Sequence, residues 1–420
     1  MEAVRTLLLM REQGVSLNDA LSDAASPFLK ELVFGVTRWY WTLQACVDSL
    51  LKKPLRKKDS DLLMLILVGL YQLRELRVPA HAAINETVGA CEQLGKGWAK
   101  GLVNAVLRSY YRGEGKVDQG LSDEARYSHP SWLLEHVRKS WPAHWDEILR
   151  ANNERAPMVL RINQRRTDRP GYLAELARCG LRGRPDDLSC CGVVLDTPVP
   201  VHTLPGFFRG WVSVQDTAAQ WAAVLLPLKA GGRVLDACAA PGGKLTHILE
   251  QYPDAGPALA IDISTKRIRM IRENLERLGV SADLRVADAA DLESWWDGNQ
   301  FDCVMLDAPC TGSGVIRRRP DIKHLRRPRD LAAMVDLQAL LLERLWQTVA
   351  PCGYLLYCTC SVFPEENDRQ METFSSGRND VDICPVRTPA GLRCGFGLQT
   401  LPGVHKVDGF YYSLLHKKGA

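Results

Sequence analysis

The segment Val234-Leu-Asp-Ala-Cys-Ala-Ala-Pro-Gly-Gly-Lys244 decides the fold of the second half of the chain. It begins with apolar residues typical of a buried strand, passes through small residues, and leads into a helix expected to start near Lys244. Gly242 and Gly243 let the backbone lie close to a ligand, because a side chain would occupy that space. The free N–H groups at the start of the helix are further donors. The segment therefore predicts a ligand-binding turn between a strand and a helix.

Short apolar runs continue this pattern along the chain. Each run leads into a turn and usually into an amphipathic stretch, which is typical of parallel strands buried on both faces. The runs are 233–235, 259–261, 284–286, 303–306 and 354–357. We therefore predict a doubly wound, Rossmann-like α/β domain over residues 226–420. A nicotinamide or flavin dinucleotide is disfavoured, because the turn lacks the G-x-G-x-x-G spacing.

The first half of the chain has a different pattern. Apolar residues recur at helical spacing over residues 3–111, which predicts an all-α bundle over residues 1–140. The polar stretch 113–120 is typical of a linker. Strand-like and helix-like stretches then follow at 158–162, 172–177 and 193–195. They predict a small α+β domain over residues 141–225.

The overall charge carries little information about partners. The 53 Lys and Arg residues against 49 Asp and Glu residues give a net charge of +4, which is too weak to indicate nucleic-acid binding. Two local clusters are more informative. The first consists of Lys52, Lys53, Arg56, Lys57 and Lys58, and the second of Arg317, Arg318, Arg319, Lys323, Arg326, Arg327 and Arg329. The first is equally consistent with a solvated face, whereas we expect the second to contact phosphates because it adjoins a candidate active site.

Targeting and cysteine usage point to a cytosolic protein. No uncharged apolar stretch reaches the roughly 18 residues of a membrane span, so no membrane association is expected. The N-terminus also lacks the apolar run of a signal peptide. The 13 cysteines are an odd number without regular spacing, which favours reduced thiols over a disulfide framework.

Three aspartates follow successive predicted strands of the α/β domain. Asp262 ends the second strand, 19 residues after Gly243, which suits a carboxylate that accepts from ribose hydroxyls. Asp288 follows the third strand, where it can accept from an adenine amino group, and Asp307 ends the fourth. A single acid after a strand is more often a turn or a helix cap. Three at successive strand ends favour ligand contact.

Two cysteine motifs leave the same edge of the predicted sheet. Leu306-Asp-Ala-Pro-Cys310 follows the fourth strand and Tyr357-Cys-Thr-Cys360 the next, so Cys310 and Cys360 are expected to be neighbours although 50 residues separate them. A thiolate can add to C6 of a pyrimidine, which activates C5, and can leave again. We assign the attack to Cys360, support of the N3 edge of the base to Asp307, and help in the final release to Cys310. Whether Asp307 or N3 carries the shared proton stays open.

Other uses of these thiols are less well supported. Free cysteines are usually core residues, and this is our expectation for Cys238, Cys303, Cys352 and Cys358. A zinc site would need Cys310, Cys358 and Cys360, but Cys-Thr-Cys lacks the two-residue gap of common ligand pairs and has no nearby histidine. A redox pair would ordinarily be Cys-x-x-Cys. We therefore expect no metal.

Three motifs together resemble the signature of the NOL1/NOP2/Sun family of RNA cytosine-C5 methyltransferases. They are Asp236-Ala-Cys-Ala-Ala-Pro-Gly-Gly-Lys244, Asp307-Ala-Pro-Cys310 and Thr359-Cys360-Ser361. The N-terminal bundle resembles a NusB-like domain. Together with the three motifs, this bundle resembles the bacterial Sun type of the family, which modifies 16S ribosomal RNA. The likeness is strongest over residues 231–363 and weakest over 157–205, where the small domain is expected to be RRM-like.

The resemblance implies a cofactor, a mechanism and a partner. S-adenosylmethionine would be held by Cys238, Ala239, Ala240, Pro241, Gly242, Gly243, Lys244, Asp262, Asp288 and Asp307 and would leave as S-adenosylhomocysteine. Cys360 would form the covalent adduct and Cys310 would promote its release. The partner would be 16S ribosomal RNA, free or in an early small-subunit assembly particle, and the protein a monomer. Two alternatives stay open: a different ribosomal or transfer RNA cytosine as target, and a non-catalytic RNA-binding factor of the antitermination type.

Overall fold

The computed structural model describes residues 1–22, 24–113 and 122–419, and these form two compact units. The helical unit contains residues 1–155 and 316–328, and the α/β unit contains residues 156–315 and 329–420. The linker predicted at 113–120 lies, apart from Gly113, outside the described residues. The boundaries of the three predicted domains stay predictions.

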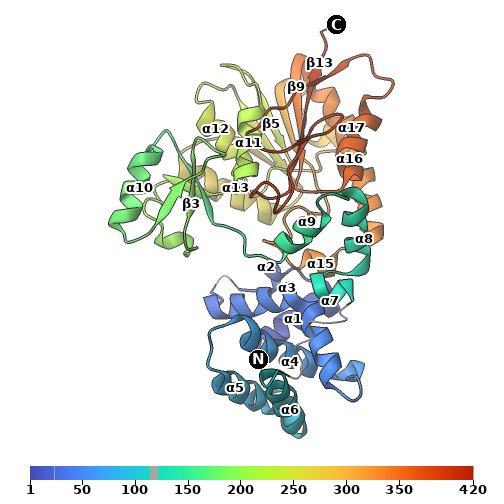
Figure 1. The fold of residues 1–420 in the computed structure, drawn as a ribbon. Coiled ribbons are helices and arrows are strands. Elements are labelled where there is room, and N and C mark those ends of the chain that lie inside the picture. Colours follow the sequence, from blue (N-terminus) through green and yellow to red (C-terminus); the bar gives the residue numbers. More distant parts are fainter. Residues whose placement is uncertain (23, 114–121, 420) are drawn as a thin grey trace. The chain divides into compact units, whose positions relative to one another are not determined.

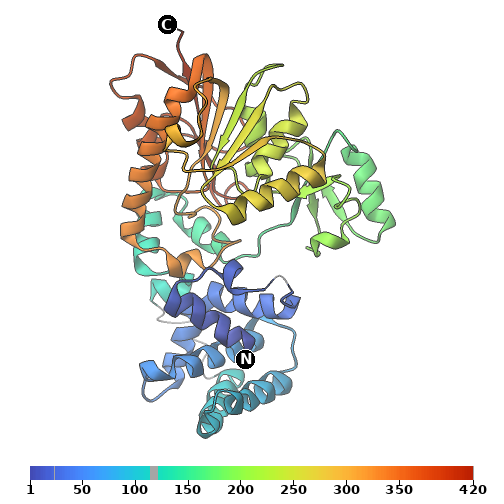
Figure 2. The same cartoon turned by 180° about the vertical axis from the view of Figure 1, so that it is seen from behind.

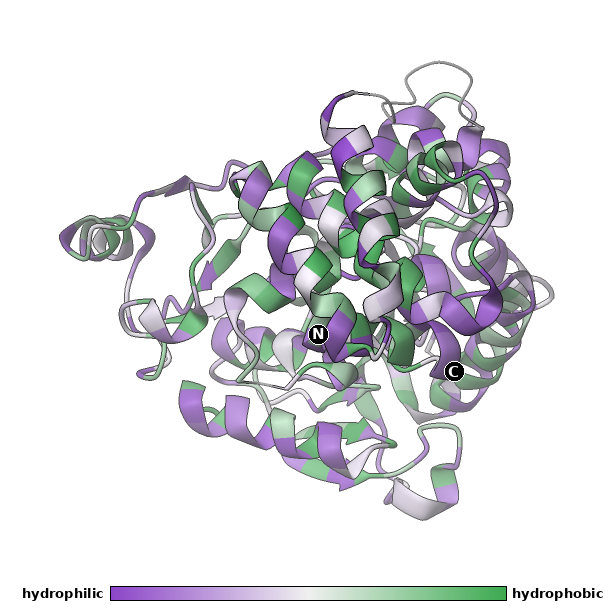
Figure 3. Cartoon of the chain, turned by 90° about the horizontal axis from the view of Figure 1, so that it is seen from below, coloured by the Kyte–Doolittle hydropathy of each residue, from purple (hydrophilic) through white to green (hydrophobic). Residues whose placement is uncertain are grey.

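The helical unit is a bundle, as the helical spacing of its apolar residues predicted. Ser26 begins its longest helix, where the side chain accepts from the Leu29 N–H at 3.1 Å and Pro27 occupies the first turn. The buried faces form one hydrophobic core, and Figure 3 shows hydrophobic and hydrophilic residues in separate bands along many of the helices. The main helices are α1 (Glu2–Gln13), α2 (Leu17–Ala20), α3 (Pro27–Leu50), α4 (Ser60–Glu75), α5 (Ala80–Gln93), α6 (Lys100–Tyr111), α7 (Asp123–Tyr127), α8 (Ser131–Ser140) and α9 (Trp145–Asn152).

The segment 316–328 completes this bundle from far along the chain. It carries α15 (Ile322–Leu325), whose Lys323 is 1% exposed and donates to the Arg38 and Ser128 carbonyls and to Asn153 Oδ1 at 2.7–2.9 Å. Burial, together with Arg38, lowers the pKa of Lys323 well below its usual value. The expectation that the whole second basic cluster contacts phosphates is therefore wrong for Lys323, and also for Arg317, which is 5% exposed.

A small antiparallel sheet forms the first part of the α/β unit. Its strand order is β2-β3-β1-β4, and the one helix between β1 and β2 is α10 (Arg169–Arg178). Leu160, Ile162 and Tyr172 lie in its core. The strands are β1 (Val159–Ile162), β2 (Gly183–Pro185), β3 (Gly192–Leu195) and β4 (Val212–Val214). The predicted small α+β domain is confirmed.

The large sheet of the α/β unit has the predicted doubly wound core. The parallel strands stand in the order β9-β8-β5-β6-β7. The strand order therefore reverses between β5 and β8: β6 and β7 are added on one side of β5, and β8 and β9 on the other. Ligands bind at the carboxyl ends of strands at such a reversal. The strands are β5 (Val234–Ala237), β6 (Ala258–Asp262), β7 (Asp283–Val286), β8 (Phe301–Asp307) and β9 (Val349–Thr359).

The final strand, β13 (Tyr411–Lys417), runs antiparallel to β9, and β12 (Leu398–Gln399), β11 (Leu392–Arg393) and β10 (Val381–Cys384) complete this side. Helices cover both faces of the sheet, with a separate hydrophobic core on each face. Figures 1 and 2 show the two sets of helices on opposite sides. One set is α11 (Thr217–Leu225), α12 (Gly243–Gln251) and α13 (Thr265–Leu278), and the other includes α14 (Leu292–Trp295), α16 (Pro328–Thr348) and α17 (Asp368–Ser375). Among the described residues, no helix is both long enough and apolar enough to span a bilayer.

Candidate active site

The turn after β5 has the backbone geometry that its glycines predicted. Gly242 has φ 91° and begins α12, and a Cβ at this position would lie 3.2 Å from Cγ2 of Ile271. A Cβ at Gly243 would meet nothing closer than 3.8 Å. Asn274 on α13 donates to the Pro241 carbonyl at 3.0 Å and so fixes the outer side of the turn. We call residues 238–244 the cofactor loop.

Lys244 and Asp307 form an ion pair beside this loop. Lys244 Nζ lies 2.5 Å from Asp307 Oδ2, and the two side chains are 12% and 28% exposed. Burial by itself lowers the pKa of Lys244, but attraction to Asp307, the nearby Cys358 sulfur and the hydrogen bond to Asp307 together raise it. The contact joins the end of β8 to the start of α12. The motif predicted both residues but not their contact.

Asp236 is a buried carboxyl group beneath the cofactor loop. It is fully buried, and neither of its side-chain oxygens has a hydrogen-bond partner within the described chain. Burial, and then repulsion from Asp307, raises the pKa of Asp236 well above its usual value. The site thus combines Asp307, in contact with Lys244, with a buried Asp236 whose ionised form is disfavoured. The sequence analysis assigned no role to Asp236.

The other two predicted acids lie at the ends of β6 and β7. Asp262 is 4% exposed, accepts from the Ser264 N–H at 3.0 Å, and has Arg267 Nη1 at 3.9 Å from Oδ2. Asp288 is exposed and accepts from the Ala290 N–H at 2.9 Å. Both carboxylates thus accept a hydrogen bond within their own turns, and both lie at the edge of the sheet where the parallel strands end. Their assignment to ribose and adenine stays a prediction.

The two predicted cysteines are neighbours. Cys310 Sγ and Cys360 Sγ lie 3.3 Å apart, one after β8 and the other after β9. The Gly314 N–H donates to the Cys360 carbonyl at 2.9 Å, which ties the two loops together. The hydrogen bond with Cys360, followed by burial, raises the pKa of Cys310 well above its usual value. The proton of Cys310 is therefore held more tightly than that of an ordinary thiol.

The remaining cysteines near the sheet differ from one another. Cys303 and Cys358 are buried, as expected of core residues, and Cys358 Sγ lies 3.5 Å from Asp307 Oδ1. Cys238 is only partly buried. The expectation for Cys352 is wrong: it is exposed and has φ 61°. It lies early in β9, beside the exposed Pro351, where the pairing with β8 shifts register.

Arg161 is a buried residue of the small sheet that the sequence analysis did not single out. Its side chain is fully buried and forms an ion pair with Glu250 of α12 at 2.8 Å. It also donates to the Gly243 carbonyl at 2.6 Å and to Thr246 Oγ1 at 3.1 Å. The small sheet therefore holds the first turn of α12, where the cofactor loop ends. A charged residue inside an apolar strand, Val159-Leu-Arg-Ile162, was the available signal.

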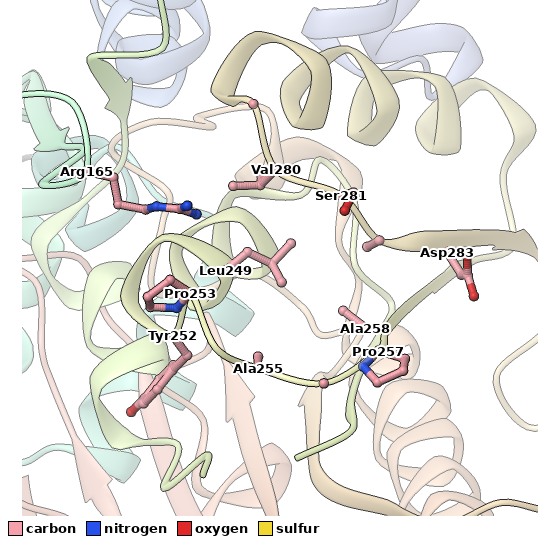
Figure 4. A pocket seen from close by; sticks show the side chains of 13 residues that line it. Arg165, Leu249, Tyr252, Pro253, Ala255, Pro257, Ala258, Val280, Ser281 and Asp283 are labelled. Atoms are coloured by element: carbon pink, nitrogen blue, oxygen red, sulfur yellow. The ribbon is translucent and has the colours of Figure 1, made fainter. Parts of the chain in front are cut away.

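A wide hollow of about 580 Å³ lies at the opposite edge of the large sheet. Its lining includes Ala258 and Asp283, which begin β6 and β7. Figure 4 shows the side chain of Arg165 extending toward Val280 on one side of the hollow. Because ligands of such sheets bind at the carboxyl ends of the strands, this hollow is separate from the candidate active site.

Comparison with known proteins agrees with this arrangement. The family model "16S rRNA methyltransferase RsmB/F" matches residues 223–416, a ferredoxin-like domain model of the same family matches 129–202, and the NusB family model matches 2–112. A ribosomal RNA small subunit methyltransferase B from Pseudomonas syringae is 47% identical over 93% of this chain and 89% of its own. The chain belongs to the RsmB/F family of 16S rRNA methyltransferases.

Other members support the same placement within the RsmB/F family. The methyltransferase B of Pseudomonas putida is 44% identical over 100% of this chain and 98% of its own. A solved methyltransferase homologue from Pyrococcus horikoshii is 26% identical over 71% of this chain and 100% of its own, with a TM-score of 0.62. The resemblance drawn from the three motifs and the NusB-like bundle is thereby confirmed.

The RsmB/F fold brings the predicted site residues to one edge of the sheet. The cofactor loop follows β5, Asp262 and Asp288 follow β6 and β7, Asp307 and Cys310 follow β8, and Cys360 follows β9. No group of three or more His, Cys, Asp or Glu side chains arranged for a metal ion occurs in the described part of the chain.

Proposed function

We propose that this protein transfers a methyl group from S-adenosylmethionine to C5 of a cytosine in 16S ribosomal RNA, with Cys360 as the nucleophile. The observation that carries the proposal is the 3.3 Å separation of the Cys310 and Cys360 sulfurs at the carboxyl ends of neighbouring strands. Two thiols at the sheet edge that also carries the Asp307–Lys244 contact suit covalent attack on a base followed by release.

The residues of the cofactor loop fit the methyl donor. Gly242 takes a left-handed conformation that leaves the start of α12 open to a ligand, and Asp236 is a buried carboxyl with no partner in the described chain. The loop 238–244, with Asp262, Asp288 and Asp307, would hold S-adenosylmethionine, which supplies an electrophilic methyl group when bound. Lys244 orients Asp307 toward this space through their ion pair.

Cys360 begins the reaction. Its sulfur, as thiolate, forms a bond to C6 of the cytosine, and the electron pair of the C5–C6 double bond moves to make C5 nucleophilic. Asp307 supports the developing charge at the N3 edge of the base, either by donating its own proton or by accepting one from N3. C5 then takes up the methyl group and becomes tetrahedral.

Cys310 ends the reaction. A base must remove the proton from C5, after which the double bond re-forms and the bond from C6 to Cys360 Sγ breaks. The contact with Cys360 is the largest cause of the raised pKa of Cys310, and this contact changes when the Cys360 sulfur becomes a neutral thioether. Cys310 then releases its proton more readily and serves, directly or through water, as the base.

The expected partner is 16S ribosomal RNA, free or in an early small-subunit particle, with the protein acting as a monomer in the cytoplasm. Family membership supports this target. Bisulfite sequencing of 16S RNA from a deletion strain and from strains carrying the wild-type or the Cys360→Ala gene tests it. One cytosine should lose protection in the deletion strain and regain it only with the wild-type gene. Unchanged 16S RNA with a lost signal in transfer RNA would identify a different target.

A further inference from the structure

Glu366 is a fully buried carboxylate located between the two cysteine loops. It follows β9 in a short 3-10 turn at Pro364–Glu366 and has no exposed surface. Burying a carboxylate is costly unless its oxygens are well hydrogen-bonded. The covalent mechanism assigns no role to this group.

The four hydrogen bonds of Glu366 reach both loops. Oε1 accepts from the Thr311 N–H at 2.7 Å, and Oε2 accepts from Thr311 Oγ1 at 2.5 Å and from the Ser361 hydroxyl. Thr311 follows Cys310 directly, and Ser361 follows Cys360 directly. Burial raises the pKa of Glu366, but all the partners donate, and these hydrogen bonds favour the ionised carboxylate with its four acceptor sites.

A fourth donor, Gln338, contacts both Glu366 and the residue before Cys310. Gln338 of α16 is fully buried, and its Nε2 donates to Glu366 Oε1 at 3.1 Å and to the Pro309 carbonyl at 2.8 Å. The carbonyl of Glu366 in turn accepts from the Tyr357 hydroxyl at 2.7 Å, which fixes the turn against β9. The carboxylate is thus held by the sheet and by α16 while it holds the cysteine loops.

We propose that Glu366 is the positioning residue that sets the spacing of Cys310 and Cys360. It touches neither sulfur, but one carboxylate binds the residues that follow both. This inference rests on the proposed function, in which release of the methylated base needs both sulfurs. Loss of Glu366 should therefore slow release more than attack, because attack uses Cys360 alone.

The spacing can be measured without RNA or methyl donor. Phenylarsine oxide condenses with two neighbouring thiols, forming two As–S bonds and releasing one water, so its capture reports the distance between the two sulfurs. Background from the other cysteines is subtracted with Cys310→Ser and Cys360→Ser variants. We expect paired capture in the wild type and about tenfold slower capture in Glu366→Ala, because displaced groups no longer meet.

The kinetic experiment uses the full chain with 16S RNA. In Glu366→Ala we expect turnover to fall by about 10²-fold, with a protein–RNA adduct accumulating on denaturing gels and the KM for RNA unchanged. Glu366→Gln should recover part of the loss, because its amide can accept from the Thr311 N–H while the two hydroxyls turn to accept from it. The matched control is Glu365→Gln, which changes the neighbouring carboxylate paired with Arg369 at 2.8 Å and should alter nothing.

If Glu366→Ala does not fold, Ser361→Ala takes its place, because it removes the hydrogen bond between the Glu366 carboxylate and the Cys360 loop. Unchanged paired capture and unchanged turnover in the folded variant would overturn the proposal. Slower capture in a system where Cys310→Ala gives no RNA adduct would support the positioning role of Glu366 while refuting the proposed role of Cys310 in release.

Discussion

The cofactor loop and the two cysteine loops stand at the same edge of one sheet, but different parts of the chain hold them. Glu366, inside the large α/β fold, binds Thr311 and Ser361 of the cysteine loops. Arg161, in the small sheet, binds Gly243 at the start of α12 and Glu250 near its end. One buried charge fixes each region, an anion in the first and a cation in the second.

The difference shows which part of the chemistry depends on the small sheet. The geometry of the two sulfurs is set within the large fold, whereas the end of the cofactor loop is set by a residue that precedes that fold in the chain. Damage to the small sheet should therefore reduce cofactor binding and leave the sulfurs in place. Damage at Glu366 should do the reverse.

The largest expected effect comes from Cys360→Ala. Removing the nucleophile should lower methyl transfer by about 10⁴-fold or more, because Cys310, the thiol 3.3 Å away, is assigned to release and not to attack. Cofactor affinity, measured by calorimetry, should equal that of the wild type, since Arg161 and the cofactor loop are untouched. Substantial remaining activity would refute the assignment of Cys360.

Next in size is Arg161→Met. It leaves Glu250 as a buried charge without its partner, which should cost about 3–5 kcal/mol in the free energy of unfolding, measured in urea. Cofactor affinity should fall with it, while paired capture of Cys310 and Cys360 by phenylarsine oxide stays unchanged. Arg161→Lys should give an intermediate result, because it keeps the charge but loses the fork of donors.

The control for this prediction is Arg165→Met, which changes an exposed arginine at the opposite edge of the sheet. It should bind cofactor normally. If Arg161→Met and Arg165→Met bind cofactor equally well, the cofactor loop does not depend on the small sheet and the comparison fails.

A smaller effect is expected for Cys310→Ala. Attack by Cys360 should proceed while release slows by about 10²-fold, the size typical of a lost general base. The product should be a trapped protein–RNA complex, seen as a slow band on denaturing gels. A fall in turnover with no such band would give Cys310 some other role.

The smallest effect concerns the buried carboxyl group of Asp236, which precedes the cofactor loop. Asp236 has a raised pKa in the folded state, so its stabilising contribution is complete below its unfolded pKa of about 4 and is lost as pH rises toward its folded value. Over that window wild-type stability should fall relative to Asp236→Asn by up to about 1.4 kcal/mol per pH unit. Urea unfolding at pH 5 and pH 6 measures this difference, and a constant difference would mean that Asp236 is ionised when folded.

The sequence was sufficient for the parts of the site that follow from local pattern. Apolar runs predicted the parallel strands, and parallel strands bring their carboxyl ends together, which placed Cys310 beside Cys360. The pairing of Lys244 with Asp307 and the four bonds of Glu366 depend on side-chain directions that spacing does not encode. Lys323 was misjudged for a related reason: a run of basic residues resembles a solvated surface, and only long-range packing buries two of its members, Lys323 and Arg317.

The helical unit also has an unusual order of synthesis. Lys323 fills the acceptors offered by Arg38, Ser128 and Asn153, yet it emerges from the ribosome 170 residues after Asn153. Until then the nascent bundle exposes carbonyl oxygens that await their ammonium donor. A fragment ending at residue 155 would keep that defect permanently, so a single cut cannot separate the bundle from the rest of the chain in finished form.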